Sequence, residues 1–133
     1  MNYVTDTHAL VWHLTEAPRL SPICQTIFGA ADEGENVIWI PSVALVEIVY
    51  LVEKRRLPKA LIEQVLALVD PPTSNYPVAP LDTPVVRALE SIDCNTVPDM
   101  PNRIIAATAW RLRLPLLSKD PAIAAVDGLN VIW

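Results

Sequence analysis

The sequence predicts an α/β protein whose sheet has five mostly parallel strands and helices on both faces. Three observations lead to this fold class. Short runs suited to strands alternate along the chain with longer helical segments, and these short runs are apolar on both faces. Such strands are typical of a parallel sheet buried between two helical layers. Finally, 133 residues, 52% of them hydrophobic, suffice for one core, so we expect a single domain over residues 1–133.

Five short runs of apolar and β-branched residues predict the strands, at residues 2–6, 37–40, 76–81, 114–118 and 130–133. Six segments between them have helical patterns, at about residues 7–15, 21–33, 42–56, 58–69, 83–92 and 101–113. Many of the 13 prolines lie at the edges of these segments, where helices begin and end. Because the chain has only three glycines, both common glycine-rich phosphate-binding motifs are absent.

The N-terminal stretch MNYVTDTHALVWHL differs from a signal peptide, because it lacks a basic region and a cleavage site and carries an acid where the apolar region should continue. No apolar run approaches the roughly 20 residues of a membrane-spanning helix. We therefore expect a cytoplasmic protein that starts at Met1 and contacts no membrane. Cys24 and Cys94 are far apart and match no metal-ligand spacing, so reduced thiols are expected.

The net charge of −5 argues against a protein that holds nucleic acid by its overall field, although local contacts stay open. Four of the ten lysines and arginines cluster at residues 54–59, and three more lie on the last long predicted helix: Lys54, Arg55, Arg56 and Lys59, then Arg103, Arg111 and Arg113. Charge runs of this kind are most often solvated helix ends.

Two acids follow predicted strands at positions where open parallel sheets bind ligands. Asp6 closes the first strand in YVTDTH, and Asp120 follows the fourth in LLSKDP, so both are expected at the same edge of the sheet. The alternative is that each caps the helix that follows it. Asp120 before Pro121 fits a cap well, since proline is favoured at the first helical position.

Glu47 interrupts an apolar stripe rather than lying on a polar face. In SVALVEIVYLVEKRRL the stripe runs through Val43, Val46, Tyr50 and Leu51 at helical spacing, and Glu47 falls inside it. A buried carboxylate is costly unless it is protonated, paired or bound to a metal. A structural salt bridge with an arginine is the simpler alternative to a functional role.

The stretch VPDMPNRIIAATAW supplies the remaining polar groups. Met100 precedes a proline and is therefore expected outside the helix, which should begin at Pro101 with Asn102 in its first turn. The helix face of Asn102 continues through small and apolar residues that can approach the sheet closely: Ile105, Ala106 and Ala109. Asp99 lies just before the helix, where its positive end favours an anion.

The acids Asp6, Glu47, Asp99 and Asp120 thus come from four elements that a parallel sheet can bring to one edge. Carboxylates at close range repel one another, so such a cluster needs divalent cations, and hard oxygen ligands suit Mg²⁺ or Mn²⁺. Zinc is not expected, since the two histidines and two cysteines form no plausible ligand set. His8 and His13 lie five residues apart on different faces of a helix and are expected to pack or face solvent.

These motifs together resemble the PIN domain family, and specifically its VapC-like toxins. The stretch VTDTHALVWHL resembles the start of the family's sequences, VALVEI its segment with a helical glutamate, and DMPNRIIAATAWRLRLPLLSKD its DxxDR segment followed by a strand and [ST]xD. The match spans nearly the whole chain. It implies a three-layer α/β/α fold with strand order 3-2-1-4-5 and an Mg²⁺- or Mn²⁺-dependent ribonuclease.

The resemblance also implies roles for individual residues. Asp6 and Glu47 match metal-site acids, and Asp120 matches the acid after the fourth strand. Thr7 and Ser118 match nearby hydroxyl positions, and Asp99 matches the first acid of the DxxDR pattern. The RNA backbone would contact Lys119, Arg103 and Arg55. Related toxins further imply an RNA substrate, an antitoxin partner and a homodimer.

Asn102 departs from the family, because it stands where the second acid of the DxxDR pattern is usually found. An asparagine keeps the shape and one carbonyl acceptor but loses the charge and adds two N–H donors. Three interpretations stay open: Asp99 completes the site, the enzyme is attenuated, or the residue was changed deliberately to make a toxic nuclease safe to produce.

Two rival functions stay open beside the nuclease. One is a non-catalytic PIN module that binds an antitoxin or another partner. The other is a phosphoacceptor receiver domain, which is disfavoured because receivers place adjacent acids after the first strand, whereas here that strand offers Asp6 alone.

Overall fold

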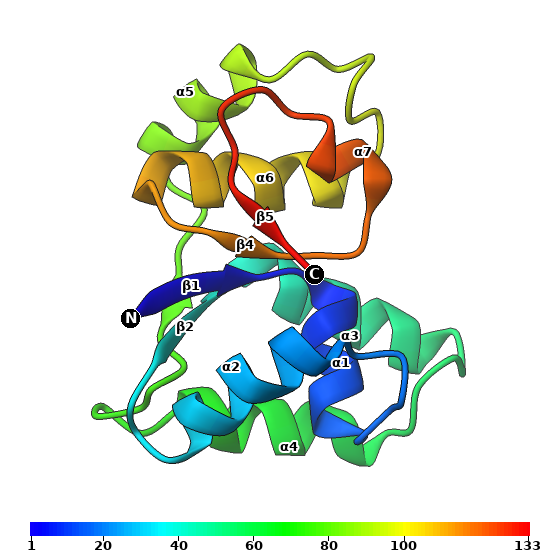
Figure 1. The fold of residues 1–133 in the computed structure, drawn as a ribbon. Helices are drawn as coiled ribbons and strands as arrows, with labels where there is room; N and C mark the ends of the chain where they lie inside the picture. The colour runs from blue at the N-terminus through cyan, green and yellow to red at the C-terminus, as the bar shows by residue number, and fades with distance from the viewer.

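The computed structural model describes all residues, 1–133, as a sheet between two groups of helices (Figure 1). Its strands are β1 (Asn2–Thr5), β2 (Val37–Pro41), β3 (Val78–Ala79), β4 (Leu116–Leu117) and β5 (Val131–Ile132). Its helices are α1 (Thr7–Leu14), α2 (Pro22–Asp32), α3 (Ser42–Glu53), α4 (Ala60–Val69), α5 (Thr83–Ser91), α6 (Met100–Leu112) and α7 (Pro121–Ala124).

The five strands form one sheet in the order β3-β2-β1-β4-β5, and every neighbouring pair is parallel. The predicted fold class and strand order are therefore confirmed. Thr5 at the end of β1 pairs with Leu117 at the end of β4. Since β1 and β4 end side by side, the residues that directly follow them, Asp6 and Ser118, are neighbours in space.

Neighbouring residues of each central strand point to opposite sides of the sheet and enter different cores. Tyr3 and Leu117 belong to one apolar cluster, whereas Val4 and Leu116 belong to the other. The first cluster is covered by α1, α2 and α4 and the second by α5, α6 and α7, on opposite sides of the sheet in Figure 1. Helix α3 follows β2 and contacts both α4 and α6.

Helix α3 ends at Glu53 and not at residue 56, and α4 begins at Ala60 and not at residue 58. Two further differences from the predicted helices are explained by an aspartate cap. Met100 is the first residue of α6, although a residue before proline was expected outside the helix. The steric preference against a helical residue before proline is outweighed here by Asp99, which accepts a hydrogen bond from Asn102 N. The short helix α7 was not predicted as a helix, but its expected cap, Asp120, is present.

The predicted stripe of α3 is wrong at Val46 and Tyr50, whereas Val43 is partly buried against the second cluster. Ala44 and Ile48 are the buried residues of this helix, while Val46 is 52% exposed and Tyr50 59% exposed. The helix is apolar almost all the way round, so the periodicity of its sequence does not specify which side faces the core. Glu47 consequently lies at the edge of the core and not at its centre.

Both cysteines are unpaired, with Cys24 buried and Cys94 exposed. None of the helices combines the length and the apolar character that crossing a membrane requires.

Candidate active site

Asp6 lies directly beyond β1 and is almost completely buried. Its backbone N–H donates to Leu117 O at 3.1 Å, and its Oδ1 accepts from Ala9 N at 2.8 Å, which caps α1. Only 4% of its surface is exposed. Burial raises the pKa of the Asp6 carboxyl, and the Asp120 charge raises it further, whereas hydrogen bonds from Ser118 and Ala9 N and the nearby His8 lower it.

Asp120 lies beside Asp6 and uses both of its carboxylate oxygens. Oδ1 accepts from Ala122 N at 2.8 Å and caps α7, and Oδ2 accepts from Asn102 Nδ2 at 2.8 Å. The buried hydroxyl of Ser118 lies near both acids: it accepts from Asp120 N at 3.1 Å, and it lowers the pKa of the Asp6 carboxyl. The expected edge position of both acids is confirmed, and each is also a helix cap.

Asp99 is engaged at the start of α6 and does not contact Asp6 or Asp120. Its exposed carboxylate accepts from Asn102 N at 3.1 Å through Oδ2. The side chain of Asn102 points instead toward Asp120. In this structure the residue that contacts Asp120 is therefore Asn102, and a ligand role for Asp99 stays a prediction.

Glu47 is half-buried and is held by a buried threonine. Thr7 Oγ1 donates to Glu47 Oε1 at 2.6 Å. Burial raises the pKa of the Glu47 carboxyl, as do the charges of Asp99 and Asp6, whereas the Thr7 hydrogen bond and His8 lower it. The alternative of a structural salt bridge is wrong for Glu47, because the one ion pair in the structure joins His13 to Asp32.

His8 is the site neighbour that the sequence did not reveal. Its exposed ring packs near Trp12, with ring centroids 5.7 Å apart, and its charge lowers the pKa of both Asp6 and Glu47. The sequence does contain a signal for this role. His8 lies in the first turn of α1, two residues after the capping residue Asp6, and residues of a first helical turn lie close to the side chain that caps it.

The predicted RNA contacts are placed very differently. Arg103 donates to the carbonyl oxygens of Leu89 and Ile92 at 2.8–3.1 Å, so much of its guanidinium is used inside the protein. Lys119 is exposed between Ser118 and Asp120. Arg55 is exposed in the turn after α3, about two helical turns beyond Glu47.

Asp6 and Asp120 provide oxygen ligands that suit a hard cation, although the number of these ligands is small. No three side chains of His, Cys, Asp and Glu lie close enough together to hold one metal ion. What does lie together is two carboxylates, from Asp6 and Asp120, with the Ser118 hydroxyl and the Asn102 amide. Mg²⁺ is commonly bound by one or two carboxylates and several waters. Since no lysine or arginine forms an ion pair with these acids, a divalent cation fits their chemistry.

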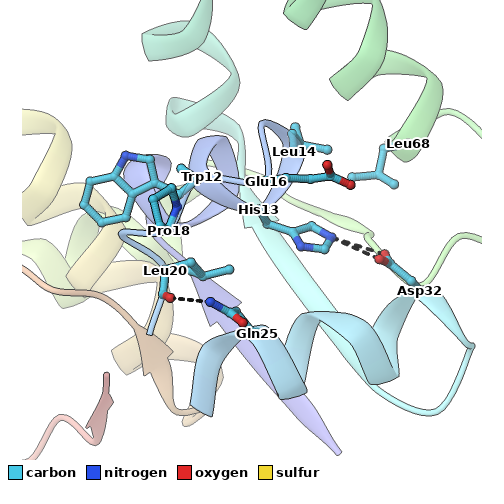
Figure 2. Close-up of a pocket in the computed structure, with 10 residues that line it drawn as sticks. Trp12, His13, Leu14, Glu16, Pro18, Leu20, Gln25, Asp32 and Leu68 are labelled. Carbon is cyan, nitrogen blue, oxygen red and sulfur yellow. Dashed lines mark hydrogen bonds and ion pairs between the residues drawn. The ribbon is translucent and has the colours of Figure 1, made fainter. Parts of the chain in front are cut away.

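A hollow of about 440 Å³ between α1, α2 and α4 is separate from these acids (Figure 2). His13 pairs there with Asp32 at 3.1 Å and stacks on Phe28 with ring centroids 4.4 Å apart, and Gln25 donates to Leu20 O at 2.8 Å. Neither Asp6 nor Asp120 lines the hollow. Of the two outcomes expected for His13, packing or facing solvent, the structure shows packing.

Comparison with known proteins agrees with the fold. The model of the PIN domain family matches residues 3–129. Among solved structures, VapBC2 from Rickettsia felis bound to a promoter DNA fragment is similar with a TM-score of 0.71 and 18% identity, over 99% of this chain and 98% of that one. DNA-bound VapBC from Salmonella typhimurium is similar with a TM-score of 0.69 and 17% identity, over 99% of this chain and 97% of that one. FitAcB from Neisseria gonorrhoeae is similar with a TM-score of 0.63 and 16% identity, over 100% of this chain and 97% of that one. No curated protein matches the sequence.

Proposed function

The chain belongs to the PIN domain family, and we propose that it is a divalent-cation-dependent ribonuclease, the toxin of a cytoplasmic toxin–antitoxin pair. The observation that carries the proposal is the pair of acids at the carboxyl edge of the sheet, Asp6 and Asp120. Asp6 is buried with a raised pKa, and no lysine or arginine forms an ion pair with either acid. Burying the Asp6 carboxyl is expensive for folding alone, and a cation that binds between Asp6 and Asp120 would explain it.

Asp6 and Asp120 are the residues that would hold Mg²⁺ or Mn²⁺. A cation bound by them would lower the pKa of bound water and neutralise charge on the scissile phosphate. The protein's own contribution is to fix both acids: helices α1 and α7 orient them through the cap hydrogen bonds, and the Ser118 hydroxyl accepts from Asp120 N. The positions of the acids are therefore set before substrate arrives.

Glu47 would position the attacking water and accept its proton. Its carboxylate is oriented by Thr7, and its raised pKa brings its basicity nearer to neutral pH, which favours proton transfer. Asp99 would add negative charge next to Glu47 at the outer side of the site. Lys119, exposed beside the acids, and Arg55, on the turn after α3, would contact the RNA backbone.

Asn102 would attenuate the enzyme, because it offers no negative charge where the family usually has an acid. The direct test is cleavage of structured RNAs with Mg²⁺, Mn²⁺ or a chelator, comparing the natural chain with Asn102→Asp and Asp6→Ala. We expect Asn102→Asp to be the most active and Asp6→Ala to be inactive. Asp82→Ala, which removes the cap of α5 outside the site, is the matched control and should retain activity. Equal rates in all four proteins would overturn the proposal.

The antitoxin partner and the homodimer rest on similarity and on one exposed surface. The similar structures include VapBC proteins and a toxin–antitoxin complex from Klebsiella pneumoniae. Val46, Val49 and Tyr50 form an exposed apolar stripe on α3 that a second copy would cover. Light scattering should show a dimer, and Val46→Glu with Tyr50→Glu should give a folded monomer. A monomeric natural chain would exclude this interface.

A non-catalytic PIN module is the second candidate, and the Asn102–Asp120 hydrogen bond favours it, since that bond uses an oxygen that a cation would need. The two candidates differ in the Asn102→Asp protein. Metal-dependent cleavage by this variant supports a nuclease, whereas partner binding without cleavage supports the module.

A further inference from the structure

The side chain of Asn102 occupies the open side of Asp120. Its Nδ2 donates to Asp120 Oδ2 at 2.8 Å, while Asp120 Oδ1 is already used by Ala122 N. Both carboxylate oxygens of Asp120 thus have an N–H donor. The neighbouring Asp6 is buried, and neither acid has a lysine or arginine partner. The amide of Asn102 is therefore the polar side chain that offsets the negative charge of Asp120.

An acid at position 102 could not make this contact. Two ionised carboxylates at hydrogen-bonding distance repel each other and need a proton or a cation between them, whereas an amide N–H donates directly to a carboxylate. A hydrogen bond to a charged acceptor is also stronger than one between neutral groups. With asparagine, the pair of position 102 and Asp120 is satisfied without any metal.

The same hydrogen bond competes with a cation. A cation that binds Asp120 through Oδ2 must displace the amide N–H, and rotating the amide to present its carbonyl oxygen breaks the bond as well. The amide thus both lacks the charge of an acid and blocks the oxygen that remains. These two effects can be separated by removing the side chain of Asn102.

We propose that Asn102 is a built-in substitute for the cation: it makes the metal-free fold independent of divalent ions and restricts loading of Asp120 to high cation concentration. Asn102 is on this account a positioning residue that acts through Asp120. The inference rests on the proposed function in taking Asp6 and Asp120 as cation ligands. It predicts behaviour of the protein that needs no RNA and no turnover to measure.

Calorimetric titration with Mn²⁺, together with thermal melting with and without Mn²⁺, tests the proposal on the natural chain, Asn102→Ala and Asn102→Asp. Without metal, both variants should melt at lower temperature than the natural chain. Asn102→Ala should bind Mn²⁺ more tightly than the natural chain by a factor on the order of ten, because the competing amide is gone. Asn102→Asp should bind most tightly, and Mn²⁺ should raise its melting temperature most.

Asn95→Ala, which alters an exposed asparagine in the loop before α6, is the matched control and should behave like the natural chain in both measurements. If Asn102→Ala binds Mn²⁺ as the natural chain does, the amide does not compete, and if it binds more weakly, the amide is a ligand; either result overturns the proposal.

The outcome is separable from that of the ribonuclease proposal. Tight Mn²⁺ binding by Asn102→Asp without RNA cleavage would refute the nuclease and leave the role of Asn102 standing. Cleavage by the natural chain with an Mn²⁺ affinity equal to that of Asn102→Ala would do the reverse. Absence of Mn²⁺ binding in all variants would overturn both.

Discussion

Arg103 joins helices α5 and α6 by hydrogen bonds, and replacing it with alanine should lower the free energy of unfolding. Its Nε donates to Ile92 O at 3.1 Å, and its Nη2 donates to Leu89 O at 3.0 Å and to Ile92 O at 2.8 Å. These carbonyl groups lie at the C-terminal end of α5, where the supply of helical N–H donors ends. Leu89 O also accepts from Ile92 N at 3.1 Å, so Arg103 supplements that bond and caps Ile92 O. Arg103→Ala would leave them without a cationic donor.

The size of the effect follows from these contacts. A hydrogen bond to a charged group contributes about 1.5–3 kcal/mol, but the three bonds share one guanidinium and two acceptors and are not additive. Water can hydrate part of the exposed carbonyl surface. We therefore expect a loss of about 2–4 kcal/mol in the free energy of unfolding, which for a chain of this size lowers the melting temperature by about 10 °C.

Urea unfolding followed by circular dichroism measures this free energy, and RNA binding below the melting range is measured in parallel. Arg111→Ala is the matched control, because Arg111 is exposed on the same helix and its side chain makes no hydrogen bond; it should lose less than about 1 kcal/mol. An Arg103→Ala protein as stable as the control but with weakened RNA binding would refute the structural role and restore the sequence-based prediction of an RNA contact.

Two further predictions concern the site acids. Asp6→Asn keeps a side-chain oxygen to cap α1 but removes a desolvated charge, so it should abolish metal-dependent cleavage yet raise the melting temperature of the metal-free protein. Because the folded-state pKa of Asp6 is raised, the cost of its charge is fully present above that pKa and is relieved as pH falls through it toward the ordinary value. The stabilisation should therefore be largest near pH 8 and shrink on acidification, and a stabilisation that does not change with pH would contradict this reasoning. Thr7→Val removes the hydroxyl that lowers the pKa of Glu47, so the acidic limb of the pH–rate profile should move to higher pH; an unmoved limb would show that Glu47 is not the group that titrates.

Much of the candidate site could be predicted from the sequence because its acids lie at positions defined by local rules. Asp6 and Asp120 directly follow strands or their loops, and parallel strands bring their carboxyl ends to one edge of the sheet. Asp99 and Asp120 precede prolines at helix starts, which marks them as caps. The choice between cap and site residue that the sequence left open has no single answer, since Asp6 and Asp120 are capping residues within the site.

Other features depend on partners that are distant in the chain. The sequence of α3 is apolar on nearly all sides, so only its contacts with α4 and α6 select Ala44 and Ile48 as the buried residues and leave Val46 and Tyr50 exposed. Arg103 likewise is a basic residue of the type that contacts an RNA backbone, and it has a structural role only because α5 ends beside it.

The sequence by itself determined the fold class and the acids that reach the carboxyl edge of the sheet, because periodicity, capping and strand ends are local properties of the chain. The strand order came from its family resemblance. Only the tertiary structure decided what each polar group bonds to. Asn102 and Asp120 are 18 residues apart, and their hydrogen bond exists because α6 and α7 are brought together beyond β4. The energy of a polar group depends on its partner and its burial, and neither is encoded at its own position.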